Sequence, residues 1–203
     1  MEKANLKTEN LKKEVIKIFK NHGLSNPHAV ISANALINAE LVGAYGHGLS
    51  RLRMYCERIS KKVINPKPKI KVKKISQSIA HIDADNSIGF VAADLAIRKA
   101  IECAKKTGIG LVAVKNSGHY GLSGYYAEQA VKKNLITMIY TNAPPAIAPY
   151  GAKKVCLELI PYVLVLQLEQ RYLLYWIQLL QKLIEEKLDL QLEIIKKYQK
   201  VLH

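Results

Sequence analysis

The order of strand and helix patterns between residues 70 and 140 constrains the fold of this chain more than any other feature. The partly alternating stretch IKVKKISQSIAHIDAD predicts one or two strands, and an apolar helical face from Phe90 to Ala104 ends at Gly108. GLVAV, at 110–114, then predicts a short buried strand, GYYAEQAVKK predicts a helix and LITMIY, at 135–140, predicts another strand. This order indicates an α/β domain with a largely parallel piece of sheet.

Two helices are predicted ahead of this domain. Thr8 to His22 has an apolar face and stops at Gly23, and Asn26-Pro27 is typical of a helix start, with an N-cap followed by proline in the first turn. We therefore expect a helical arm over residues 1–64, followed after the loop NPKPK by a partial α/β domain with a mixed sheet over residues 65–155.

The third segment, residues 156–203, has an unusual composition. All eleven glycines of the chain precede it, and it contains no Ala, Ser, Thr, Asn, Phe or Met, yet it holds fourteen Leu and six Gln. Its pattern predicts a Leu-rich amphipathic helical tail. A real helical domain and a segment of other origin both remain open at this point.

Composition narrows the function classes. The net charge of +15 suits a nucleic-acid partner, but Lys outnumbers Arg 26 to 5 and the lysines are spread along the chain, so we expect no nucleic-acid partner. The best candidate membrane span, 163–180, is interrupted by polar and charged residues. Three widely spaced cysteines form neither a disulfide framework nor a metal cluster. We expect a cytoplasmic protein with no membrane segment, no signal peptide and no metal.

Two glycine-rich segments are candidate sites. In GAYGHGLSRLRMYCERI, His47 lies between Gly46 and Gly48 directly after a predicted helix, and Arg51 follows four residues later. A histidine can transfer a proton near neutral pH, and an arginine can bind a carboxylate through two parallel hydrogen bonds. A histidine that caps the helix and an arginine at the surface are the alternative. In NSGHYGLSGYYAEQA, His119 follows the strand GLVAV, where ligands of α/β sheets bind, although GHYGLSG is not the G-x-G-x-x-G dinucleotide fingerprint.

Together these segments resemble the malate/L-lactate dehydrogenases of the second type, whose relatives act on sulfolactate, ureidoglycolate and diketogulonate. The resemblance runs from about Leu11 to Lys154 and is carried by NAELVGAYGHGLSRLRMYCERI, IDADNSIGF, GHYGLSGYYAEQA and TNAPPAIAPYG. This chain has Gly46 where the family usually has serine and Ala152 where it has a second glycine. The lost serine hydroxyl removes one possible substrate contact.

The resemblance implies a non-Rossmann fold, a homodimer and reversible hydride transfer between NAD or NADP and a small 2-hydroxy acid such as malate, lactate or sulfolactate. Arg51 would hold the carboxylate, and His47 or His119 would give a proton to the oxygen. The resemblance places the cofactor beside residues of the second segment and one asparagine: His119, Tyr120, Gly121, Leu122, Ser123 and Asn142.

The tail departs from the family, whose members continue with G-T-N-P, L-D-x-A-T-S and R-G-K-I. A shifted reading frame restores these motifs. When the third base of each codon is joined to the first two bases of the next, the codons of Tyr175-Trp176-Ile177 can encode only Leu-Asp. Read in the same way, 157–161 permits Gly-Thr-Asn-Pro, 184–188 permits Arg-Gly-Lys-Ile and 197–200 permits Ile-Pro-Glu/Lys-Gly. All four matches fall at the separations found in the family. We therefore expect a frameshifted tail and an inactive, truncated enzyme. The alternative function is a non-catalytic interaction protein with a dehydrogenase-like first half and a helical tail.

Overall fold

The computed structural model describes residues 7–142, 145–148, 154, 157–158, 162–168 and 171–176. The chain divides into two compact units, Met1–Leu135 and Ile136–His203. This division does not follow the segment boundaries expected from the sequence, because the helical arm and the start of the α/β segment share one core.

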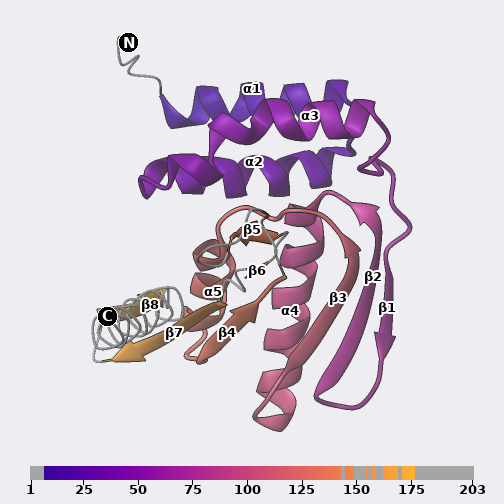
Figure 1. Cartoon of the computed structure of the whole chain (residues 1–203). Helices are drawn as coiled ribbons and strands as arrows, with labels where there is room; N and C mark the ends of the chain where they lie inside the picture. Colours follow the sequence, from indigo (N-terminus) through magenta and orange to yellow (C-terminus); the bar gives the residue numbers. More distant parts are fainter. Residues whose placement is uncertain are drawn as a thin grey trace, which may run out of the picture. The chain divides into compact units, whose positions relative to one another are not determined.

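The first unit begins with a layer of helices (Figure 1). Helices α1 (Thr8–Asn21) and α2 (Asn26–Leu41) confirm the two predicted helices, and α3 (Leu52–Ser60) lies in the same layer. The N-cap of α2 is Ser25 rather than the expected Asn26, and proline falls in its first turn, where the missing N–H is not needed. Two short 3₁₀ turns, η1 (Tyr45–His47) and η2 (Leu49–Arg51), connect α2 to α3.

The second layer of this unit is a three-stranded sheet with order β1-β2-β3. Strand β1 (Lys71–Lys74) pairs antiparallel with β2 (Ile79–Ser87), and β2 pairs parallel with β3 (Leu111–Ser117). Helix α4 (Gly89–Thr107) makes the crossover between the two parallel strands, and α5 (Ser123–Val131) follows β3. The predicted strand–helix–strand–helix order is therefore confirmed within this unit, with a mixed sheet.

Strand β3 differs from the expectation of a buried strand. Of its seven residues only Val112 is even partly buried, and Leu111 is 59% exposed. The reason is its place at the edge of the sheet, since within the described residues β3 pairs with β2 alone. An apolar run predicts burial on both faces only where further strands and helices cover it.

One core joins the helical layer to α4. Phe19 of α1, Leu36 of α2, Tyr55 of α3 and Phe90 of α4 are all 0% exposed and belong to one cluster. The ring centroids of Tyr55 and Phe90 lie 4.8 Å apart. This contact anchors the start of α4 against α3, and with it the neighbouring loop described below.

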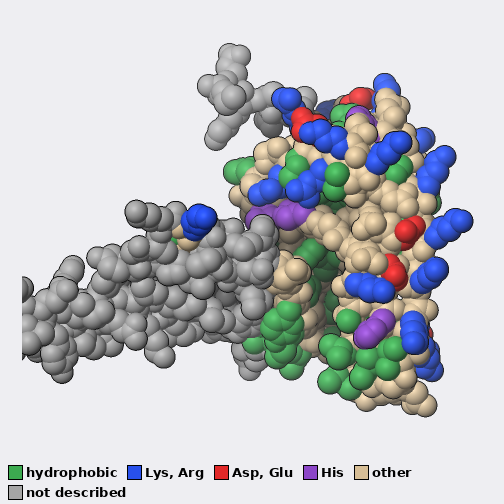
Figure 2. Space-filling model, turned by 45° about the vertical axis from the view of Figure 1, so that its right-hand side comes forward, with side chains coloured by type: hydrophobic (Ala, Val, Ile, Leu, Met, Phe, Trp, Pro, Cys, Tyr) green, Lys and Arg blue, Asp and Glu red, His purple; other side chains and the backbone are tan. Residues whose placement is uncertain are grey.

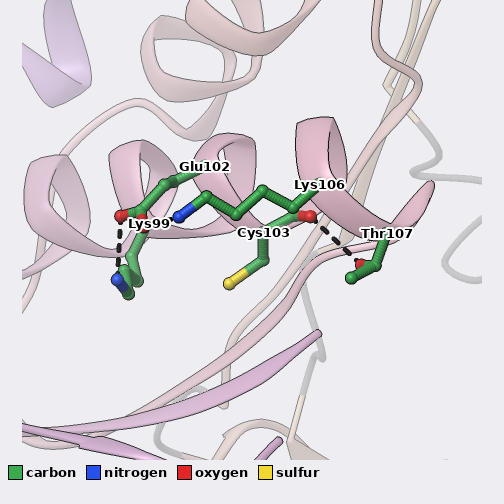
Figure 3. Close-up of polar contacts among 5 residues, drawn as sticks. All are labelled: Lys99, Glu102, Cys103, Lys106 and Thr107. Atoms are coloured by element: carbon green, nitrogen blue, oxygen red, sulfur yellow. Dashed lines mark hydrogen bonds and ion pairs between the residues drawn. The ribbon is translucent and has the colours of Figure 1, made fainter. Parts of the chain in front are cut away.

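Three charged side chains of α4, Lys99, Glu102 and Lys106, lie together near the C-terminal end of the helix (Figure 3). Glu102 pairs with Lys99 and Lys106 at 2.8 Å each, and these two hydrogen bonds lower the pKa of its carboxyl to about 2. Cys103 is buried, and its carbonyl accepts a hydrogen bond of 3.1 Å from the Thr107 hydroxyl. The helix ends as predicted at Gly108, whose φ of +82° gives the left-handed C-cap that glycine favours.

The second unit is built from strands in its described part. The predicted strand at 135–140 forms β4 (Thr137–Tyr140), but it pairs antiparallel with β7 (Tyr162–Leu168) and not with the sheet of the first unit. Strand β7 pairs with β8 (Arg171–Trp176), and β5 (Pro145–Ile147) pairs with β6 (Leu157–Glu158).

The helical prediction for the tail is therefore wrong for residues 157–158, 162–168 and 171–176. The stretch YVLVLQL contains one tyrosine and two valines, and aromatic and β-branched residues favour strands once a partner strand is available. Leu168 and Arg171 are paired across β7 and β8. The amphipathic pattern after residue 178 lies outside the described residues.

Candidate functional site

The loop after β3 packs directly on the start of α4. A Cβ atom at Gly89 would come within 2.3 Å of the carbonyl oxygens of Gly118 and His119, so this close approach requires glycine at position 89. Because β2 and β3 are parallel, their carboxyl ends reach the same edge of the sheet. His119 is thus held where ligands bind in α/β sheets.

The segment with His47 and Arg51 is held by its own backbone contacts. The carboxylate of Glu40 on α2 accepts a hydrogen bond of 2.6 Å from the Leu49 amide, and a Cβ atom at Gly48 would collide with this carboxylate. Nε of Arg51 donates to the carbonyl oxygen of Gly46 at 2.5 Å. Gly48 is therefore required by this turn, whereas a Cβ at Gly46 would meet nothing within 4 Å.

The structure brings the two candidate histidines together. The rings of His47 and His119 are stacked, with centroids 5.8 Å apart and planes inclined by 14°. They come from the turn after α2 and from the loop after β3, which are separated in sequence by the whole β1–β3 sheet. Both rings are partly exposed.

Tyr55 and Gly121 complete the surroundings of His119. The Tyr55 hydroxyl lies 2.6 Å from Nδ1 of His119, and the backbone N–H of Gly121 donates to the same nitrogen at 3.2 Å. Gly121 has φ of +80°, and a Cβ there would approach Cε1 of Phe90 to 2.7 Å. Both the left-handed backbone and the contact with Phe90 require glycine at this position.

Burial and positive charge keep both histidines neutral near pH 7. Burial lowers the pKa of His119 to about 4, and the charges of Arg51, His47 and Arg58 contribute to the same shift. The pKa of His47 is also lowered, by burial first and by Arg51 second. Burial raises the pKa of the Tyr55 hydroxyl, which therefore stays protonated and able to donate a hydrogen bond.

The expected cofactor residues fall into two places. His119, Tyr120, Gly121, Leu122 and Ser123 form one continuous loop, in which the Tyr120 and Ser123 hydroxyls lie 3.0 Å apart and Leu122 is the N-cap of α5. The Tyr126 hydroxyl donates to the Tyr120 carbonyl at 2.8 Å and ties the loop to α5.

Asn142, the sixth expected cofactor residue, belongs to the other unit. It follows β4 and is exposed.

Within the described ranges, no group of three or more His, Cys, Asp or Glu side chains could hold a metal ion, and no helix is long and apolar enough to cross a membrane. Lys and Arg side chains are scattered over the visible face of the first unit rather than gathered in one patch (Figure 2).

Tyr55 is the residue that motif reasoning missed. It lies on α3 four residues after Arg51, one helical turn away, and it is 0% exposed. A tyrosine on the apolar face of a short helix is typical of a core residue, which Tyr55 also is. Its second role, the contact with His119, joins positions 64 residues apart and has no local sequence signal.

Comparisons with known proteins match one family over most of the chain. The family model described as malate/L-lactate dehydrogenase matches residues 6–163. The chain is 40% identical over 149 residues to the L-sulfolactate dehydrogenase of Methanocaldococcus jannaschii, covering 73% of this chain and 43% of that protein. It is 42% identical over 137 residues to the malate dehydrogenase of Pyrococcus abyssi, covering 68% and 38%.

A solved structure is similar over a longer range. The malate dehydrogenase of Pyrococcus horikoshii OT3 superposes with a TM-score of 0.79 at 33% identity, covering 84% of this chain and 49% of that one. The chain therefore spans less than half the length of these curated relatives and about half of the solved structure.

Proposed function

Because the chain belongs to the malate/L-lactate dehydrogenase family, we propose that its site serves hydride transfer between a nicotinamide cofactor and a small 2-hydroxy acid. The observation that supports this most is the assembly of His47, Arg51 and His119, which come from distant segments of one unit. Malate, lactate and sulfolactate are the candidate substrates.

Arg51 is the group that we assign to the substrate carboxylate. Its charge acts on both histidines, so it lies near them, and its guanidinium offers two parallel N–H donors to a carboxylate. The contact from Nε to the Gly46 carbonyl fixes one edge of the group and leaves the terminal nitrogens for a ligand. The positive charge of Arg51 contributes to lowering the pKa of both histidines, so it acts at the place where we propose that the substrate anion binds.

One of the two histidines exchanges a proton with the substrate oxygen. When a 2-oxo acid is reduced, the oxygen becomes an alkoxide that is far too basic to remain unprotonated. His47 and His119 both lie beside Arg51, and their stacked rings place two proton-carrying groups at one site.

The loop from His119 to Ser123 fits an anionic cofactor. The first turn of α5 has no acidic residue and no side-chain cap, so its N–H groups favour a negatively charged group. The NAD or NADP assignment also follows the names of related dehydrogenases, which specify NAD(+) in one case and NADP(+) in another. Bound there, the cofactor would supply or accept the hydride, while Tyr120, Gly121, Leu122 and Ser123 would hold it.

We further propose that residues from about 156 onward are read from a shifted frame and that this chain is an inactive form of the enzyme. The break in composition and the four family motifs recovered in the shifted frame support this proposal. We also propose the homodimer and the cytoplasmic location that the family implies.

The nucleotide sequence around codons 152–158 tests the frame proposal. Inserting or deleting one or two bases should open a frame that spells Gly-Thr-Asn-Pro soon after Gly151 and Leu-Asp-x-Ala-Thr-Ser later. Stop codons ahead of the Leu-Asp position would refute the frameshift, and the tail would then be a genuine part of the protein.

The frame-restored protein tests the function. We expect it to oxidise NADH or NADPH with oxaloacetate, pyruvate or 3-sulfopyruvate. Arg51→Lys should raise KM for the oxo acid strongly, because an ammonium group cannot copy the planar fork. Arg53→Lys is the matched control, since the Arg53 side chain is 89% exposed and its described ion pair is with Glu57 on the same helix. Equal effects of the two substitutions, or no effect of His47→Ala and His119→Ala on turnover, would contradict the assignment.

A further inference from the structure

The hydrogen bonds around His119 determine where its ring carries a proton. Nδ1 lies within hydrogen-bond distance of two groups, the Gly121 amide at 3.2 Å and the Tyr55 hydroxyl at 2.6 Å. A backbone N–H can only donate, so Nδ1 must act as an acceptor toward Gly121. An N–H on Nδ1 would point at another N–H and lose this bond.

Tyr55 then donates to the same nitrogen. Its hydroxyl could in principle donate or accept, but the acceptor role of Nδ1 leaves donation as the consistent arrangement. The Tyr55 ring is 0% exposed and packs against Phe90, so its hydroxyl is aimed at His119 by the core itself.

We infer that Tyr55 and the Gly121 amide are positioning groups that hold His119 as a neutral imidazole with its single proton on Nε2. This assignment rests on the proposed function for its catalytic meaning, but the tautomer is a property of the ring that can be measured without turnover. It also explains why GHYGLSG carries Gly121, because only glycine gives this amide its place beside Phe90 and His119.

The tautomer decides what His119 can do for a substrate. Nε2–H is a hydrogen-bond donor, so it can polarise the carbonyl oxygen of a 2-oxo acid as hydride arrives.

Nitrogen-15 NMR of the histidine rings tests this inference in the whole 203-residue chain. Long-range proton–nitrogen spectra distinguish a protonated from an unprotonated ring nitrogen, and His119→Gln identifies the His119 signals. We expect Nδ1 to be unprotonated and Nε2 protonated at pH 7, in a single tautomer.

Tyr55→Phe removes the hydroxyl and keeps the ring that packs on Phe90. Since a hydrogen bond to Nδ1 stabilises the neutral ring, this variant should raise the protonation midpoint of His119 by about half to one pH unit and populate the second tautomer. Tyr45→Phe is the control, because Tyr45 is 64% exposed and its ring makes no stacking contact with His119 among those described. It should leave the midpoint and the tautomer unchanged.

A proton on Nδ1 in the unsubstituted chain, or a Tyr55→Phe spectrum identical to it, would overturn the inference. The outcome is separable from the proposed function. A correct tautomer with an inactive frame-restored enzyme would remove the function and leave the inference, whereas an active enzyme with Nδ1 protonated would do the reverse.

Discussion

Gly121→Ala is the substitution whose cost the structure defines most sharply. Gly121 combines two demands, a φ of +80° and a Cβ position 2.7 Å from Cε1 of Phe90. A non-glycine residue in the left-handed region costs about 1–2 kcal/mol, and forcing an extra methyl into a packed core costs about 1–3 kcal/mol. Phe90 is 0% exposed and cannot swing into solvent. We therefore expect Gly121→Ala to lower the free energy of unfolding by about 2–5 kcal/mol.

Alanine substitutions at three other glycines separate the cost of the left-handed backbone from the cost of the contact with Phe90. Gly43 and Gly108 have φ of +77° and +82°, and a Cβ atom at either would meet nothing within 4 Å, so alanine there measures the backbone cost alone. Gly46 has neither demand, so Gly46→Ala measures the baseline of a glycine replacement. The difference between Gly121→Ala and Gly108→Ala then reports the contact with Phe90.

Urea unfolding followed by near-ultraviolet circular dichroism gives these free energies by linear extrapolation. The double variant with Phe90→Leu should recover part of the loss at Gly121, because the smaller side chain leaves room for the methyl group, and neighbouring sites are not additive. If Gly121→Ala costs no more than Gly108→Ala, the close packing of this loop on Phe90 is refuted.

Three further predictions concern the same unit and its chemistry. The pKa of His119 is lowered to about 4 in the folded state, so as pH falls the unfolded chain takes up a proton on this ring before the folded chain does. The free energy of unfolding should therefore decrease by about 1–2 kcal/mol between about pH 6.5 and pH 4, a value reduced to allow for the partial exposure of the ring. His119→Gln should remove this part of the pH dependence, as measured by urea unfolding at several pH values. Gly46→Ser should fold normally and change the free energy of unfolding by less than about 1 kcal/mol, since the site of the family's serine is open space; a large loss would show that the turn needs glycine. The 203-residue chain should show no turnover of malate, lactate or sulfolactate above a His47→Ala control, because an unpositioned hydride donor gives no rate advantage.

The order of elements could be predicted from the sequence because local signals set it. The arm helices α1 and α2 are followed by Gly23 and Gly43, and α4 ends at Gly108; all three glycines have the left-handed conformation that favours glycine at a helix end. The α4 crossover has a clear apolar face and a glycine stop, and these are enough to place it between two strands.

Burial and strand pairing could not be predicted, because they depend on neighbours. GLVAV has the pattern of a buried strand, yet β3 is an exposed edge among the described strands. The tail stretch YVLVLQL fits either a leucine-rich helix or a strand, and its pairing with β4 decides for the strand. In both cases the deciding contact comes from a distant part of the chain.

The same distinction applies to the site. His47, Arg51 and His119 could be identified from the sequence because glycines flank the turns that contain them. Tyr55 could not, because no nearby residue in the sequence indicates its contact with His119.

His47, Arg51, Tyr55 and His119 form a cluster within Met1–Leu135, a unit that has its own core of buried side chains from α1, α2, α3 and α4. Tyr55 and Phe90 belong to that core and also fix the surroundings of His119. A change of reading frame near residue 156 therefore need not disturb the tautomer, the stacking of the histidines or the cost of Gly121→Ala. The relatives continue beyond the segment that they share with this chain, and we expect turnover to need residues from that part. Spectroscopic and stability measurements thus report on the cluster itself, and only an activity assay of the frame-restored protein reports on the complete enzyme.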